Sequence, residues 1–177
     1  MSRYSRELLT QASMLAELDS NRPKQANLRR SVSASYYALF HFLVEESTRL
    51  AFGTQHLQKL IRNFAGRAFV HGKMKSVCED FQKQIPSSKI LRPWWGRLPI
   101  ADNPDLILIA SAFVDLQQQR HTADYDLSTL SLRADARNAA TSVQQSMAAW
   151  SKLQTLEPEI AKLFATSLML WPGLSGR

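Results

Sequence analysis

The stretch from Pro23 to Gly53 most constrains the fold, because its pattern predicts one long helix that is apolar around most of its circumference. Pro23 suits the first turn of a helix, and Gly53 suits its end. Apolar side chains recur between them at steps of three and four residues, at Leu28, Val32, Tyr36, Leu39 and Leu43. A helix that is apolar on most sides is normally buried among other helices. We therefore expect this helix at the centre of a helical bundle.

The same helical spacing recurs along the rest of the chain, and no strand pattern or internal repeat appears. It predicts helices at about residues 6–18, 54–71, 74–85, 104–125 and 132–153, with a last helix from Pro158. Between Pro86 and Pro104 the periodicity is lost in one long Trp/Pro-rich loop. We predict an all-α fold, an antiparallel helical bundle with additional short helices. Residues 1–157 are expected to form the bundle, and residues 158–177 a helical extension of the same domain.

The chain of 177 residues carries 22 Lys and Arg against 15 Asp and Glu, which gives a net charge of +7. This excess favours polyanionic partners such as RNA, although a basic solvated surface without a nucleic-acid role explains the charge equally well. The single Cys78 cannot form an internal disulfide, which fits a reducing compartment. No apolar run is long enough for a signal peptide or a membrane span. We expect a cytoplasmic protein without membrane contact.

A narrow polar stripe interrupts the apolar surface of the Pro23–Gly53 helix. Arg30, Ser33, Tyr37 and His41 follow one another at helical spacing and fall on one side of the helix. Polar side chains on a buried helix need hydrogen-bonding partners. We expect Tyr37 and His41 to find such partners on a neighbouring helix, and this stripe is the first candidate site.

The sequence RHTADYD at the end of the 104–125 helix supplies a second set of polar groups. Arg120 and Asp124 are four residues apart and share a helical face, with His121 and Tyr125 on the adjacent row. These groups suit phosphate chemistry, because a guanidinium binds phosphate, an imidazole moves a proton near neutral pH and a phenol donates a hydrogen bond. The alternative is an ordinary ion pair at a helix end. We expect Arg120 or Asp124 to partner the stripe of the central helix.

Basic and aromatic residues in two further segments suit single-stranded RNA, because cations bind the phosphates and aromatic rings stack on the bases. One segment surrounds the predicted end of the third helix, and the other is the Trp/Pro-rich loop. The predicted RNA-binding residues are Arg62, Arg67, His71, Lys73, Arg92, Trp94 and Trp95. The alternative is a solvated charged face, with the tryptophans packed onto the bundle.

Three segments in this order, LRRSVSASYYALFHFL, GTQHLQKLIRNF and RHTADYD, resemble the HEPN superfamily, in particular small prokaryotic HEPN proteins with an Arg-x-x-Ala-Asp-Tyr motif. The resemblance covers residues 5–155. It implies a helical bundle, often dimeric, that is linked to RNA cleavage, nucleotide binding and toxin–antitoxin or defence systems. The residues that match the family pattern are Arg30, Tyr36, Tyr37, His41, His56, Arg120, Asp124 and Tyr125.

The function that this resemblance implies is an RNA-directed protein, a metal-free endoribonuclease of a toxin–antitoxin or defence system, acting as a homodimer. No metal site and no cofactor is expected, because His, Cys and carboxylate residues do not cluster at ligand spacing. The implied catalytic residues are Arg120, His121, Asp124 and Tyr125, supported by Arg30, Tyr37 and His41.

Two other hypotheses remain open at this point. Ribonuclease members of the family separate the active His from the Arg by four to six residues, whereas His121 directly follows Arg120. This difference favours a non-catalytic module that binds a partner protein, such as a nucleotidyltransferase antitoxin, or a nucleotide. The third hypothesis is a structural subunit that docks through Ile160, Leu163 and Phe164 of the last helix.

Overall fold

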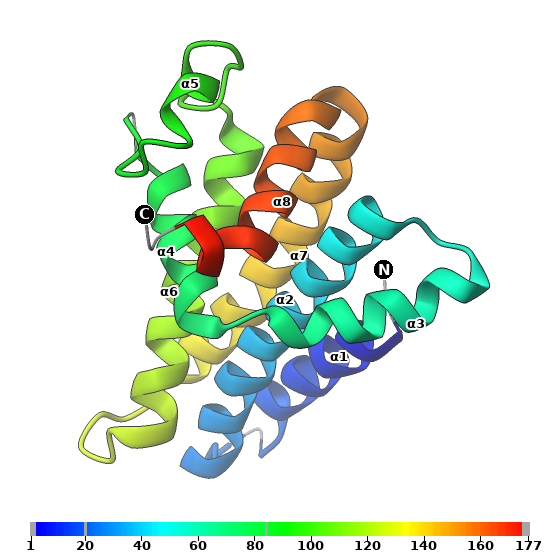
Figure 1. Ribbon diagram of the computed structural model, residues 1–177. Helices are drawn as coiled ribbons and strands as arrows, with labels where there is room; N and C mark the ends of the chain where they lie inside the picture. Colours follow the sequence, from blue (N-terminus) through cyan, green and yellow to red (C-terminus); the bar gives the residue numbers. More distant parts are fainter. Residues whose placement is uncertain (1–2, 20, 84, 175–177) are drawn as a thin grey trace.

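The computed structural model describes residues 3–19, 21–83 and 85–174, which form helices and connecting loops without a β-strand (Figure 1). The predicted all-α class is confirmed. None of the described helices is long and apolar enough to cross a bilayer. The elements are α1 (Arg3–Glu17), α2 (Gln25–Phe52), α3 (His56–Ala65), the 3₁₀ turn η1 (Gly66–Ala68), α4 (His71–Phe81), α5 (Arg92–Trp95), α6 (Pro104–Tyr125), α7 (Arg133–Leu156) and α8 (Pro158–Leu174).

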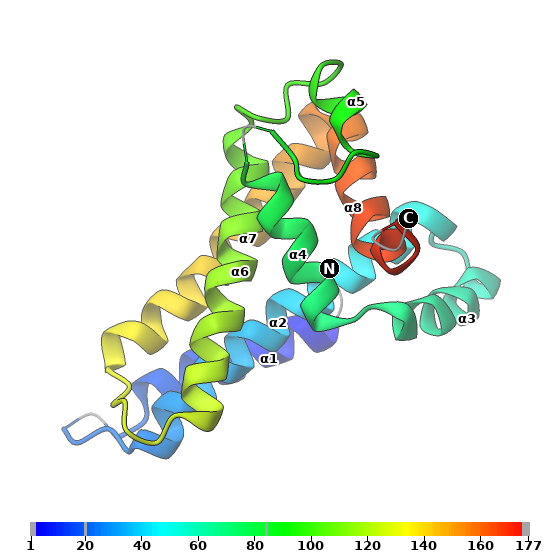
Figure 2. The same cartoon turned by 60° about the vertical axis from the view of Figure 1, so that its left-hand side comes forward.

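Helix α2 is the centre of the molecule, because α1, α6, α7 and α8 all pack against it (Figures 1 and 2). This is the position that its apolar pattern predicts. The helix begins at Gln25 rather than at Pro23, because Lys24 still has extended backbone, with φ −74° and ψ 133°. It ends as predicted before Gly53, whose φ of +78° is a left-handed conformation that glycine adopts without strain.

Helix α6 carries the RHTADYD sequence at its C-terminal end, and its N-terminal end is well defined. The Asn103 side chain accepts a hydrogen bond from the Leu106 N–H at 2.9 Å, and Pro104 occupies the first turn. The apolar residues that follow are buried between α2, α4 and α7. This packing fixes the helix along its length and so positions the polar residues of its last turns.

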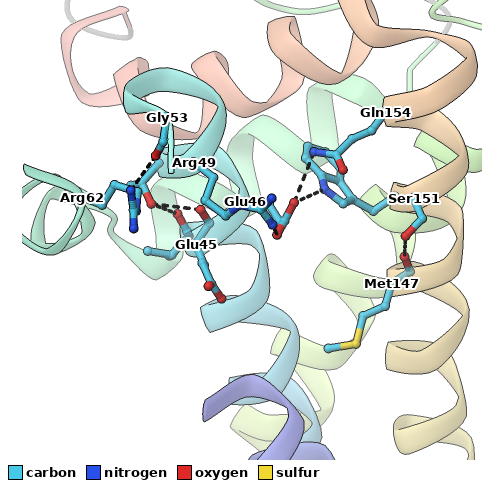
Figure 3. Close-up of polar contacts among 11 residues, drawn as sticks. Glu45, Glu46, Arg49, Gly53, Arg62, Met147, Ser151 and Gln154 are labelled. Atoms are coloured by element: carbon cyan, nitrogen blue, oxygen red, sulfur yellow. Dashed lines mark hydrogen bonds and ion pairs between the residues drawn. The ribbon is translucent and has the colours of Figure 1, made fainter. Parts of the chain in front are cut away.

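A buried carboxylate joins α7 to α2 (Figure 3). The Glu46 side chain is only 4% exposed and forms an ion pair with Arg49 at 2.7 Å. It also accepts hydrogen bonds from Trp150 Nε1 at 3.0 Å and from Gln154 Nε2 at 3.2 Å. A charge this deeply buried is tolerated only with such partners. These contacts therefore fix the position of α7 along the central helix.

The segment after α2 differs from the prediction of a single helix to residue 71. Helix α3 ends at Ala65, η1 turns the chain, and a new helix, α4, begins at His71. The extended backbone of Phe69 and Val70 separates the two helices and brings Phe69 into the core, where it is 7% exposed. Helix α3 buries none of its own residues and projects beside the bundle (Figure 2). It is therefore not one of the packed neighbours that the sequence predicts.

The C-terminal helix α8 packs against α2, α4 and α7. Ile160 and Phe164 are fully buried there, and Leu163 is partly buried. The hypothesis that these three side chains form a docking face is therefore wrong, because they complete the protein's own core. Residues 175–177 of the predicted C-terminal extension lie outside the described residues.

Candidate functional site

The two polar sets predicted from the sequence meet where α2 crosses α6. Arg120 Nη2 donates a hydrogen bond to the Tyr37 hydroxyl at 2.9 Å. One turn away on α2, the Ser33 hydroxyl donates to Asp124 Oδ1 at 2.5 Å. The expectation that RHTADYD supplies partners to the stripe of the central helix is confirmed for Tyr37, whereas the contacts described for His41 are with aromatic rings. We call the residues around this crossing the Arg120 cluster: Tyr4, Ser33, Tyr36, Tyr37, His41, His71, Arg120, Asp124 and Tyr125.

Arg120 lies among aromatic rings and beside one carboxylate. Its Cζ atom is 5.6 Å from the ring centroids of Tyr37 and Tyr125 and 6.0 Å from that of Tyr36. Its Nε atom is 2.9 Å from Asp124 Oδ2, although this ion pair lacks hydrogen-bond geometry. The Arg120 side chain keeps 24% of its surface exposed. The cation is thus held in place by its neighbours while part of it stays accessible to solvent.

His71, which the sequence assigns to the basic RNA surface, belongs instead to the Arg120 cluster. It lies at the start of α4, with its Nδ1 atom 2.5 Å from the Tyr36 hydroxyl and its ring stacked 4.0 Å from Phe40. Burial lowers the pKa of His71, and the nearby charges of Arg120 and His41 lower it further. The imidazole is therefore kept neutral at pH values where an exposed histidine starts to protonate.

His41 occupies the other side of the cluster. Its ring meets the Tyr4 ring edge-on, with 4.9 Å between centroids, and burial lowers its pKa as well. Tyr4 comes from α1 and was not identified from the sequence. One signal was available, because Tyr4 is four residues before Leu8 and extends the apolar face of that helix towards the central one. The cluster thus draws on α1, α2, α4 and α6.

Arg30, a predicted supporting residue, does not join the cluster and is exposed. Its neighbour Arg29 reaches α6 instead, donating hydrogen bonds to the carbonyls of Ala123 and Asp126 at 2.9 Å and to that of Thr129. Arg29 therefore holds the turn that follows RHTADYD. Both arginines fit the spacing of the polar stripe, and adjacent helical residues point about 100° apart. The periodicity alone could not choose between them.

His121 also lies apart from the guanidinium of Arg120. It is exposed, and its ring is 5.0 Å from that of Tyr125, which is 65% exposed. The sequence-predicted row of His121 and Tyr125 is therefore present, but it faces solvent. Among the described residues, no three His, Cys, Asp or Glu side chains gather in a way that could hold a metal ion.

The residues predicted to bind RNA do not form one surface. Helix α5, which carries the loop's basic and aromatic residues, lies far from α3 in both views (Figures 1 and 2). Trp95 packs on Phe81, with 5.0 Å between ring centroids, and donates to the Lys83 carbonyl at 3.2 Å. Trp94 is 41% exposed. Trp95 is therefore packed onto the bundle, as the alternative interpretation predicts.

The four basic side chains predicted for that surface differ in whether they are hydrogen-bonded within the protein. Arg62 donates to the Gly53 carbonyl at 2.5 Å, and Arg92 Nε donates to the Pro86 carbonyl at 3.3 Å. Arg67 and Lys73 are exposed. Arg67 and Lys73 therefore present their charges to solvent, whereas Arg62 and Arg92 are hydrogen-bonded to backbone carbonyls.

The Arg120 cluster is the part of the described chain best suited to chemistry. It combines an oriented cation, phenol hydroxyls and two imidazoles whose pKa values are lowered. A guanidinium can bind a phosphate group, and a neutral imidazole can accept a proton. Comparison with protein-family models, curated protein sequences and solved structures finds no match for this chain.

Proposed function

We propose that this protein is an RNA-directed ribonuclease of HEPN type that cleaves without a metal ion, with the Arg120 cluster as its site. The observation that carries the proposal is the guanidinium of Arg120, oriented by Tyr37 and close enough to His71 to lower that residue's pKa. In cleavage of a phosphodiester by its own 2′-hydroxyl, a neutral imidazole can accept the hydroxyl proton and a fixed cation can stabilise the charge on the phosphate oxygens. The basic net charge of +7 supports a polyanionic substrate.

In this mechanism the ribose 2′-hydroxyl attacks the adjacent phosphorus while a histidine takes its proton. The bond from phosphorus to the 5′-oxygen breaks, which leaves a 2′,3′-cyclic phosphate and a 5′-hydroxyl that is protonated from water. Arg120 stabilises the negative charge that develops on the phosphate oxygens. His71 is assigned as the base in place of His121, because His121 faces solvent beside Tyr125. In the tautomer that carries its proton on Nδ1, His71 donates to the Tyr36 hydroxyl and keeps a free lone pair on Nε2 for this role.

One observation favours a second function, a non-catalytic HEPN module that binds a partner protein, such as a nucleotidyltransferase antitoxin, or a nucleotide. Asp124 already neutralises Arg120 at 2.9 Å, and the His71 ring is stacked on Phe40. An internally paired arginine and a packed histidine also serve to join α4 and α6 to the central helix. In that case the cluster stabilises the fold, and binding occurs on another surface.

Cleavage of end-labelled single-stranded RNA and of tRNA in EDTA separates the two functions. We expect the wild-type protein to cleave, and we expect Arg120→Ala and His71→Gln each to lower the rate about 100-fold or more. Arg137→Ala is the matched control, since Arg137 also forms an ion pair, with Glu17, but lies outside the cluster. Its rate should equal that of the wild type. A cyclic phosphate at the new 3′ end identifies the chemistry.

Two results contradict the ribonuclease proposal. The first is RNA that stays intact with the wild-type protein. The second is cleavage that persists in Arg120→Ala and His71→Gln, which indicates a contaminating nuclease. Circular dichroism and urea unfolding of each variant show whether a lost rate reflects lost folding. Retained partner or nucleotide binding without cleavage supports the non-catalytic module.

A further inference from the structure

Helix α3 has its apolar side turned away from the protein. Its four large apolar side chains follow at steps of three, one and three residues and form one stripe. The partly buried residues of the helix, Gln58, Arg62 and Ala65, lie on another side. An amphipathic helix normally packs its apolar side against the core and exposes its polar side. The stripe, which we call the α3 face, consists of Leu57 (78% exposed), Leu60 (69%), Ile61 (50%) and Phe64 (78%).

Specific contacts hold α3 in this orientation. Arg62 Nη1 donates to the Gly53 carbonyl at 2.5 Å, which ties the polar side of the helix to the end of α2 (Figure 3). The Gln58 side chain accepts from the Gln55 N–H at 2.9 Å and forms a capping box with Gln55 at the start of α3. The same Gln58 side chain lies against Gly53. The Gly53 backbone, with φ +78°, makes the sharp turn between the two helices. The exposed stripe is therefore a consequence of defined polar contacts of Arg62 and Gln58 with the turn between α2 and α3.

The α3 face is a continuous patch, unlike the single exposed apolar side chains found on most proteins. Its four apolar side chains share one helical stripe and are each at least half exposed, and a grouped apolar surface of this kind is typical of an interaction site. The spacing also matches the way one helix meets another, through residues at i, i+3, i+4 and i+7. The α3 face thus has the form of a surface that receives a helix.

The charges around α3 select the kind of partner. The segment from Ser47 to Cys78 contains six basic residues and no acidic one. Lys59 on α3 itself, and Arg67 and Lys73 after it, are exposed. A second copy of this chain would bring these positive charges against each other, which disfavours self-association through α3. RNA suits the cations but leaves the apolar stripe in water. We propose that the α3 face binds an amphipathic helix of a partner protein, with acidic residues flanking an apolar stripe.

The proposal is independent of cleavage at the Arg120 cluster, and it can be tested with synthetic helices. The probe is a fluorescein-labelled 18-residue peptide with Leu at i, i+3, i+4 and i+7 of each repeat and Glu at the flanking positions. The comparison peptide has the same Leu pattern and Lys in place of Glu. Fluorescence anisotropy against the full chain measures both affinities. Vesicles of phosphatidylglycerol and phosphatidylcholine test an anionic membrane, and sedimentation equilibrium tests self-association.

We expect saturable binding of the Glu peptide and binding of the Lys peptide at least tenfold weaker. Leu60→Gln and Phe64→Gln should each weaken binding about tenfold or more, because a few large apolar side chains contribute most of the affinity of an interface. Both side chains are exposed, so neither change should disturb folding. Leu156→Gln is the matched control, since Leu156 is 71% exposed at the end of α7, outside the α3 face, and should bind as the wild type does.

Several outcomes overturn the proposal. Equal affinity for both peptides, or no binding of either, rejects an acidic helical partner. Binding to anionic vesicles alone assigns the α3 face to a membrane surface. A dimer that Leu60→Gln dissociates assigns it to a second copy of the chain. RNA cleavage by the α3 variants is measured in parallel, and an unchanged rate shows that the two sites are separate.

Discussion

The hydrogen bond between Arg120 and Tyr37 is the contact on which the candidate site depends, and a double-mutant cycle tests it directly. Tyr37→Phe removes only the hydroxyl that accepts from Arg120 Nη2 at 2.9 Å. Arg120→Gln removes the cation. The double variant reports whether the two changes act on one interaction. If the geometry is correct, the cost of losing the hydroxyl should disappear once the guanidinium is absent.

The expected magnitudes follow from the contacts of Arg120. Tyr37→Phe loses one hydrogen bond to a charged donor at a partly exposed position, about 1 kcal/mol, and keeps the aromatic ring. Arg120→Gln loses that bond, the ion pair with Asp124 at 2.9 Å and the ring contacts with three tyrosines, together about 2–3 kcal/mol. The double variant should cost about the same as Arg120→Gln alone. The coupling energy is then about 1 kcal/mol.

Urea unfolding at pH 7.5, followed by circular dichroism, measures all four free energies of unfolding. Distant changes usually add to within about 0.5 kcal/mol, so a coupling energy below that value refutes the contact. The control cycle pairs Tyr37→Phe with Arg137→Gln, whose guanidinium bonds to Glu17 on α1. That pair should be additive. A coupling as large in the control would mean that the denatured state, rather than the contact, explains the result.

Two further predictions concern stability. Burial lowers the pKa of His41 and His71 from 6.5, so below pH 6.5 the unfolded chain binds more protons than the folded one and the free energy of unfolding should fall. Urea midpoints at pH 7.5 and 5.5 measure this loss, which should be smaller in His71→Gln; an equal loss would exclude His71 as a cause. Gly53→Ala should cost about 1 kcal/mol or more, since Gly53 has φ +78° and a Cβ there would lie 2.5 Å from Gln58 Oε1. Gly72→Ala, in open space on α4, should be neutral or stabilise by up to about 1 kcal/mol in thermal unfolding, and equal effects at the two glycines would contradict this explanation.

Much of the fold could be predicted because helical periodicity is a local property. The central position of α2 followed from its apolar circumference, and the start of α6 followed from Asn103 and Pro104. The break after α3 could not be predicted in this way. Phe64, Ala68 and Phe69 continue a helical spacing, and only the burial of Phe69 in the core decides that the chain leaves the helix there.

The candidate site was predicted in part for the same reason. Arg120 and Asp124 share a face of any helix, and the hydrogen-bonding needs of Tyr37 on a buried helix called for a partner such as Arg120. His71 was assigned to a basic surface because its sequence neighbours are cations. Its true neighbours, Tyr36 and Phe40, are more than 30 residues away in the chain.

The sequence by itself thus determined the helices, the central role of α2 and the pairs of side chains that lie on one helical face, because these depend on residues within a few turns of one another. Only the tertiary structure decided which histidines join Arg120, which of Arg29 and Arg30 reaches α6, and that the α3 face points into solvent. These features depend on where the chain turns and on which distant segments pack together in the core. A pattern of neighbouring residues in the sequence does not contain that information.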